Sequence, residues 1–231
     1  MPYFAYYDPL YWGFFIVSLI IIVTAQVNVR SRFKKYSLVY NAKGITGRQA
    51  AEMVLRSAGI YNVTIEPTAG NLTDHYDPRS AVIRLSESVY DKATIAAVGI
   101  AAHEAGHAIQ HAKGYAPLKV RNAIIPLTQV GPSIGVFLLV LGAAFNFPAL
   151  ITTGIALFSV ALVFQLVTLP VEFNASRRAI EIIRNSGILT PDEQFGAASV
   201  LSAAAMTYLA AMLQTLLTLM YYILRFSNRR R

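Results

Sequence analysis

The feature that most limits how this chain can fold is the stretch of residues 122–171, which contains no charged residue and no histidine. A helix needs about 20 consecutive apolar residues to cross a bilayer, so this stretch is long enough for two crossings. A turn signal, Asn-Phe-Pro at residues 146–148, lies at its centre. The sequence therefore predicts a transmembrane hairpin over residues 123–169. Both ends of such a hairpin emerge at the same face of the membrane.

Two further uncharged stretches are long enough to cross a membrane. Residues 9–29 predict one span, and we expect a retained anchor because no cleavage site is evident. Residues 195–224 predict packed or membrane-inserted helices, either a fourth span or a packed Ala-rich helix followed by a segment that dips into the bilayer. We favour four spans. With 55% hydrophobic residues and a mean hydropathy of +0.47, the chain is expected to be a mainly α-helical integral membrane protein.

Basic residues indicate the orientation. Arg30, Arg32, Lys34 and Lys35 follow the first predicted span, whereas the flank before it has no basic residue. Cytoplasmic loops carry an excess of Lys and Arg, so we expect the site described next to face the cytoplasm. Basic residues on both sides of the hairpin agree: Lys113, Lys119, Arg121, Arg177, Arg178 and Arg184. The four arginines after residue 224 oppose a simple fourth span.

His103, Glu104 and His107 form the pattern His-Glu-x-x-His. On a helix, residues four apart lie on one face about 5–6 Å apart, so both imidazoles can bind one zinc ion while Glu104 faces its water. An apolar run at residues 93–102 precedes the pattern, as expected for a buried helix. The spacing predicts one catalytic Zn²⁺. The alternative is a pair of ordinary helix-surface histidines.

A third zinc ligand must come from elsewhere in the chain. His111 continues the spacing, but it lies a rise of about 12 Å from His103, too far for both to bind one ion. There is no cysteine, and His75 is the only other histidine, so a carboxylate is favoured. Glu172 directly follows the uncharged stretch, and the hairpin returns it to the face where His103 emerges. The alternative for Glu172 is a charge at the membrane interface.

Residues 33–93 are expected to form a small soluble segment that leans on the helix with the histidines, since it is short for an independent core. Thr46 is a candidate N-cap for an amphipathic helix that runs to about Ala58. Gly59 is the expected helix stop.

Two strands are expected in this segment, at residues 63–66 and 81–86, with a turn at residues 74–78 between them. The second strand is either an edge that binds an extended peptide by strand addition or an internal strand. His75 or Tyr76 are candidates to hydrogen-bond the oxyanion that develops during hydrolysis. The alternative for His75 is a turn histidine satisfied by nearby groups.

Three segments resemble the YugP-like neutral zinc metallopeptidases: DHYDP at residues 74–78, HEAGHAIQH at residues 103–111 and LPVEFNASRR at residues 169–178. The resemblance covers most of the chain. Those proteins are membrane gluzincins related in layout to the HtpX and Ste24 class. The resemblance implies a gluzincin-like zinc peptidase core with a small sheet. It also implies the metal ligands and the catalytic base: His103, His107, Glu172 and Glu104.

The chain departs from the wider gluzincin pattern at Ser176, where those proteins carry an aspartate four residues after the third ligand. Such a carboxylate orients a ligating histidine, and its loss weakens metal binding. Asn174, Ser176 or Asp77 are the candidates to replace it.

These observations predict a membrane-bound zinc-dependent endopeptidase at the cytoplasmic face of the cell membrane, acting in quality control or processing of membrane proteins. Three protein ligands leave one zinc position open for water and substrate. One alternative is a non-catalytic, zinc-stabilised membrane scaffold, which would not need Glu104. Another is an intramembrane protease of the site-2 type, for which the apolar run at residues 93–102 is short.

The net charge of +8 comes mainly from basic residues beside the predicted spans, so anionic membrane lipid is a more suitable partner than nucleic acid. The other expected partners are a polypeptide substrate and a membrane protein. The expected organisation is a span at 9–29, the cytoplasmic part of the catalytic domain at 33–122, a hairpin at 123–169, a third-ligand helix at 170–193 and C-terminal helices at 195–224.

Overall fold

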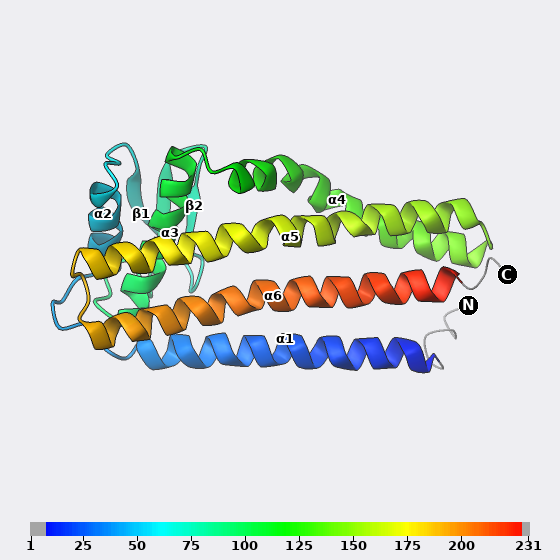
Figure 1. Cartoon of the computed structure of the whole chain (residues 1–231), viewed down its shortest axis with the longest axis horizontal. Coiled ribbons are helices and arrows are strands. Elements are labelled where there is room, and N and C mark those ends of the chain that lie inside the picture. The colour runs from blue at the N-terminus through cyan, green and yellow to red at the C-terminus, as the bar shows by residue number, and fades with distance from the viewer. Residues whose placement is uncertain (1–7, 228–231) are drawn as a thin grey trace. The chain divides into compact units, whose positions relative to one another are not determined.

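The structure is a computed structural model that describes residues 8–227; the arginines at 229–231 lie outside this range. The described chain is mainly helical with one small sheet, as expected, and runs from α1 in blue to α6 in red (Figure 1). The helices are α1 (Pro9–Tyr36), α2 (Gly47–Ser57), α3 (Ile95–Ala112), α4 (Ala116–Ala144), α5 (Pro148–Asn185) and α6 (Pro191–Ser227). The strands are β1 (Thr64–Thr68), β2 (His75–Asp77) and β3 (Val82–Ser86).

The described chain divides into two compact units. The first, called here the helical unit, contains residues 8–26, 119–169 and 207–227. The second, called the histidine unit, contains residues 27–118 and 170–206. α1, α4, α5 and α6 each contribute to both units, whereas α2, α3 and the sheet belong entirely to the histidine unit.

Few apolar side chains of the helical unit are buried within the described chain. Four helices, α1, α4, α5 and α6, are long and apolar enough to cross a membrane, which matches the number of spans expected. In the most apolar part of α1 only 6% of the residues are buried, and in that of α5 only 11%. Large apolar side chains such as Phe137 and Leu166 are more than half exposed, at 61% and 53%.

The hairpin turn lies where the sequence predicts it. α4 ends at Ala144 and α5 begins at Pro148, and Asn146 between them adopts a φ of 51°. Gly135 and Gly154 allow the two helices to approach closely, because a Cβ on Gly154 would lie 2.6 Å from the carbonyl oxygen of Gly135.

α5 continues unbroken through Pro170, so the segment that carries Glu172 is the second half of the hairpin helix and ends at Asn185. It is therefore not a separate helix over residues 170–193. A proline inside a helix removes one backbone hydrogen bond, but helix-forming residues on both sides carry the helix on. α6 is likewise one helix rather than a packed helix followed by a separate segment, and α1 extends beyond residue 29 to Tyr36.

α2 forms as its local signals predict. The side chain of Thr46 accepts a hydrogen bond from Gln49 N at 3.3 Å, and Gln49 Oε1 accepts one from Thr46 N at 2.9 Å, which makes a capping box. The helix ends at Ser57, and Gly59 adopts a φ of 73°, a conformation that glycine tolerates.

The sheet decides between two alternatives and corrects one expectation. β3 pairs in parallel with β1 and antiparallel with β2, so it is the central strand, and the edge-strand alternative for residues 81–86 is excluded. The internal-strand alternative is confirmed. Residues 75–77, expected as a turn, pair with β3 as β2. A strand of three residues is too short to show the alternation by which strands are recognised in a sequence.

Candidate metal centre

α3 carries His103, Glu104 and His107 into the interior of the histidine unit. Thr94 caps the helix by accepting a hydrogen bond from Ala97 N at 3.3 Å. Most of the helix is buried, and it packs against α2, β2 and β3. The small side chains before His103 allow this close packing, because alanine and glycine keep the helix narrow.

Glu172 reaches the histidines because α3 and α5 approach closely at Gly106. A Cβ at Gly106 would lie 2.7 Å from the carbonyl oxygen of Ala175 and 3.3 Å from its Cα. Only glycine allows the two backbones to lie this close. Gly106, the second variable position of the His-Glu-x-x-His pattern, is therefore needed to bring Glu172 close to the two histidines.

Three potential ligand atoms converge between α3 and α5. Glu172 Oε2 lies 3.3 Å from His103 Nε2 and 3.5 Å from His107 Nε2. Ligands held about 2.0–2.1 Å from zinc at the corners of a tetrahedron are about 3.3–3.4 Å apart. All three ligand atoms lie within 4.8 Å of one another. The residues therefore fit a tetrahedral ion with one remaining position.

The carboxylates of Glu172 and Glu104 favour positive charge in this cluster. Burial raises the pKa of Glu172, but the hydrogen bonds and charge of the two imidazoles outweigh burial and bring that pKa below its usual range. Burial lowers the pKa of His107, but the carboxylates of Glu172 and Glu104 outweigh it and raise that pKa. Glu172 therefore stays ionised at neutral pH, as a metal ligand must.

The outward-facing nitrogens of the two histidines have neutral partners. His103 Nδ1 lies 3.1 Å from Ser176 Oγ, and His107 Nδ1 lies 3.0 Å from Gln110 Oε1. Ser176 was one of the three candidates to replace the aspartate of related proteins. Gln110 was missed by the sequence analysis, although its position one turn after His107 on the same helix face could have revealed it.

Comparison with known proteins agrees with this arrangement. A family model described as "Putative neutral zinc metallopeptidase" matches residues 11–227. The chain belongs to this family. It is also 46% identical over 206 residues to a protein of Bacillus subtilis (strain 168) described as "Putative membrane protease YugP", a match that covers 89% of this chain and 92% of that protein. No solved structure gives a significant match.

Glu104 directly follows the potential ligand His103 on α3. Its side chain is largely buried, at 8% exposure, and its negative charge contributes to the raised pKa of His107. Its role as the general base stays a prediction.

His75, Tyr76 and His111 form contacts of their own. Tyr76 Oη lies 2.9 Å from His111 Nδ1, which confirms that His111 makes a hydrogen bond instead of joining the ligand cluster. His75 Nδ1 lies 2.8 Å from the Thr73 carbonyl oxygen, as expected for a satisfied turn histidine. A role for His75 or Tyr76 in oxyanion stabilisation stays a prediction.

Asp77 is engaged within the sheet and does not replace the missing aspartate. Its carboxylate accepts hydrogen bonds from Ser80 Oγ at 2.7 Å and Arg79 N at 2.9 Å, and lies 3.4 Å from Arg84 Nη1. These contacts lower the pKa of Asp77 to about 2, and the hydrogen bond from the Ser80 hydroxyl has the largest effect. Asn174 acts only indirectly, because it contacts Gln110 rather than a histidine.

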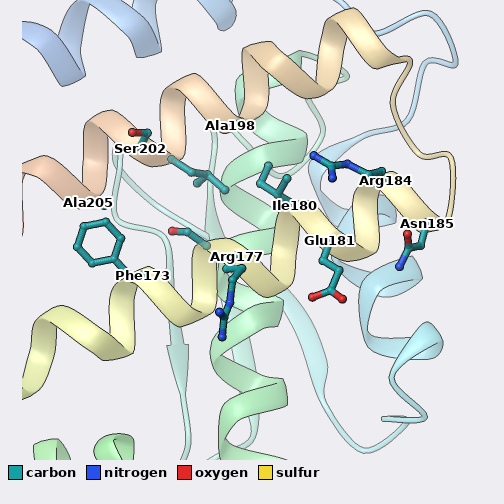
Figure 2. A pocket seen from close by; sticks show the side chains of 11 residues that line it. Phe173, Arg177, Ile180, Glu181, Arg184, Asn185, Ala198, Ser202 and Ala205 are labelled. Carbon is teal, nitrogen blue, oxygen red and sulfur yellow. The ribbon is translucent and has the colours of Figure 1, made fainter.

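Side chains of α5 and α6 line a groove (Figure 2), and Ser176, which contacts His103, is among its lining residues. The groove lies between the second half of α5 and the first half of α6 and has a cavity volume of about 610 Å³. Its lining is mixed: Phe173, Ser176, Arg177, Ile180, Glu181, Arg184, Asn185, Ala198, Leu201, Ser202 and Ala205. Since Ser176 also contacts His103, a large side chain at this position would change both the groove and the metal centre.

Proposed function

We propose that this chain is a membrane-embedded zinc endopeptidase with a gluzincin-like core. His103, His107 and Glu172 hold one zinc ion, and Glu104 is the catalytic base. The observation that carries the proposal is the convergence of two imidazoles and one carboxylate within 4.8 Å of one another. The separations of Glu172 Oε2 from the two Nε2 atoms match the edges of a tetrahedral zinc site.

The proposed roles follow from the positions of the side chains. Bound zinc would lower the pKa of a water molecule toward about 7 and polarise the scissile carbonyl. Glu104 accepts the proton of the attacking water and later delivers it to the nitrogen of the leaving amine. The hydrogen bonds to Ser176 and Gln110 hold the two imidazoles with Nε2 toward Glu172.

We further propose that α1, α4, α5 and α6 cross the cell membrane, with the active site on the cytoplasmic side. The exposed apolar surface of the helical unit supports this, because water would not tolerate so large a patch. Aromatic residues cluster at the first turns of α1, where Tyr11 stacks on Phe15 and lies 5.5 Å from Tyr221 between ring centroids. Aromatic belts mark membrane interfaces, and the basic residues of α1 lie at its other end.

Arg225 is consistent with a fourth span. Its Nε lies 3.4 Å from Asp8 Oδ2, and Tyr221 Oη donates to the same carboxylate oxygen at 3.2 Å. The first span usually dominates the orientation of the whole chain. Arg225 would then lie on the non-cytoplasmic side, where the carboxylate of Asp8 neutralises its charge. Anionic lipid is the proposed partner of the basic residues on the cytoplasmic side.

The decisive experiment compares the purified wild-type chain with Glu104→Gln in detergent with zinc, using an unstructured protein as substrate. Both should bind one zinc ion, and the variant should cleave about 10²–10⁴-fold more slowly. Glu87→Gln, at an exposed glutamate just after β3 and outside the groove, is the matched control and should cleave normally. If neither wild type nor control cleaves while both hold zinc, the scaffold alternative is favoured. Equal cleavage by Glu104→Gln would contradict the proposed mechanism.

The intramembrane-protease alternative is disfavoured by α3, which is buried inside the histidine unit and is not among the candidate spans of the described chain. We propose that the substrates are membrane proteins undergoing quality control or processing, with a membrane protein as a further partner. Cleavage of a spanning substrate near its cytoplasmic end, mapped by mass spectrometry, would test this.

A further inference from the structure

We infer that Gln110 is a positioning residue that holds His107 in the orientation required for metal binding. The inference rests on the proposed zinc site. Gln110 is 0% exposed and lies on α3 one turn beyond His107. Burial of an amide is costly unless its polar atoms are hydrogen-bonded, so the contacts of this side chain show what it does.

The contacts of Gln110 leave one possible orientation for its amide. Gln110 Nε2 donates to the carbonyl oxygen of Val171 at 2.7 Å and to Asn174 Oδ1 at 3.0 Å. A backbone carbonyl can only accept, so the NH₂ group must face Val171. The amide oxygen must then face His107 Nδ1, 3.0 Å away, and that nitrogen has to donate. His107 Nε2 is thereby left to face Glu172 and a metal ion.

A second anchor fixes the same arrangement from the side of Asn174. Arg178 Nε donates to Asn174 Oδ1 at 2.8 Å, and a guanidinium group can only donate. Asn174 must therefore present its oxygen to both Arg178 and Gln110. Two groups of α5 anchor the network, and each has a single hydrogen-bonding role: the Val171 carbonyl oxygen only accepts, and the Arg178 guanidinium only donates. The helix that carries Glu172 thus also sets the orientation of a histidine on α3.

The other histidine is held less strictly. The partner of His103 Nδ1 is the hydroxyl of Ser176, which can either donate or accept. Ser176 therefore does not determine whether His103 Nδ1 donates or accepts the hydrogen bond. In this protein the amides of Gln110 and Asn174 supply, at His107, the constraint that a carboxylate supplies in related metal sites.

The test measures Zn²⁺ affinity of the full-length chain in detergent by competition with a chelator, together with the visible spectrum of the Co²⁺-loaded protein. Gln110→Leu should lower Zn²⁺ affinity about 10–100-fold and change the Co²⁺ spectrum. Asn174→Leu should act in the same direction. Asn174→Asp should stay close to wild type, because a carboxylate keeps the acceptor for Arg178 and Gln110. Gln194→Leu is the matched control, because within the described residues the Gln194 side chain donates to the Leu189 carbonyl oxygen, at 2.9 Å, and contacts no candidate ligand.

Unchanged affinity and an unchanged Co²⁺ spectrum in Gln110→Leu and Asn174→Leu would overturn the inference. So would an equal loss in the Gln194→Leu control, because that would indicate general destabilisation. If Gln110→Leu does not fold, the contrast between Asn174→Leu and Asn174→Asp, at a half-buried position, decides. Failure of the wild-type chain to bind zinc would contradict the proposed function itself, an outcome distinct from normal binding by every variant.

Discussion

The first two turns of α3, residues 95–102, and the first half of α5 are both uncharged and apolar, yet they lie in different surroundings. Ala97, Val98 and Ala102 of α3 are 0% exposed, whereas Val163 and Leu166 of α5 are 48% and 53% exposed. Side-chain size contributes to the difference, because most residues of α3 before His103 are alanine or glycine. Small residues let α3 pack closely against other backbones, while large side chains on α5 present an apolar surface outward. An apolar sequence therefore predicts an apolar environment for the helix. Only the structure shows whether that environment is the protein interior, as for α3, or lies outside the protein, as for the first half of α5.

The strongest way to test this comparison is to place the same charge in both helices. Ala102→Asp buries an unpaired carboxylate in α3 and should cost more than about 4 kcal/mol, so the histidine unit should not fold or bind zinc. Val163→Asp should leave zinc binding intact in detergent but disfavour membrane insertion by about 2.5–3.5 kcal/mol. Circular dichroism, zinc binding and membrane fractionation measure these effects. Normal zinc binding by Ala102→Asp would contradict the description of α3 as a core helix.

A second pair of substitutions tests the close approach of α3 and α5. Gly106→Ala places a Cβ 2.7 Å from the Ala175 carbonyl oxygen and should destabilise the protein by about 1–3 kcal/mol, with weaker zinc binding. Gly13→Ala in α1 meets no atom within 4 Å and should gain up to about 1 kcal/mol of helix stability. Thermal unfolding in detergent compares the two. A stabilised Gly106→Ala protein with wild-type zinc affinity would show that the close approach is not needed.

A smaller effect is expected at Ser176. Ser176→Ala removes the hydroxyl beside His103 and should weaken zinc binding about tenfold, at the low end for partners of metal ligands because a hydroxyl binds less strongly than a carboxylate. Ser176→Asp restores the residue type of related gluzincins and should bind zinc at least as tightly as wild type. The adjoining groove leaves room for the larger side chain. Chelator competition measures both, and weaker binding by Ser176→Asp than by Ser176→Ala would contradict this view.

The smallest effect concerns Asp74, far from the ligand cluster in sequence. Burial raises the pKa of Asp74 above its usual 3.8, although hydrogen bonds from the N–H and hydroxyl of Ser86 oppose the shift. Folding is therefore favoured while the carboxyl is protonated, and this contribution is lost as pH rises from 3.8 through the raised pKa. Asp74→Asn should remove that pH dependence. Urea unfolding of both proteins across this window tests the sign, and identical pH profiles would contradict it.

Much of the candidate site could be predicted because its signals are local. The spacing of His103 and His107 depends only on helix geometry, and the capping box at Thr46 lies within four residues. Gln110 and β2 escaped prediction for the opposite reason. The role of Gln110 depends on Val171 and Asn174, which are distant in sequence, and β2 exists only because β3 pairs with it. Hydrogen bonds between distant segments leave no periodic pattern in a sequence.

The sequence by itself determined the four long apolar helices, the hairpin turn and the pair of histidines on one helix face, because each follows from hydropathy or helical periodicity along a continuous segment. Only the tertiary structure decided that α5 continues through Pro170 and that β3 is a central strand. It alone also decided that Gly106 brings the backbones of α3 and α5 together. These features depend on which segments, distant in sequence, pack against each other. Helices pack so closely that one added methyl group can prevent the contact.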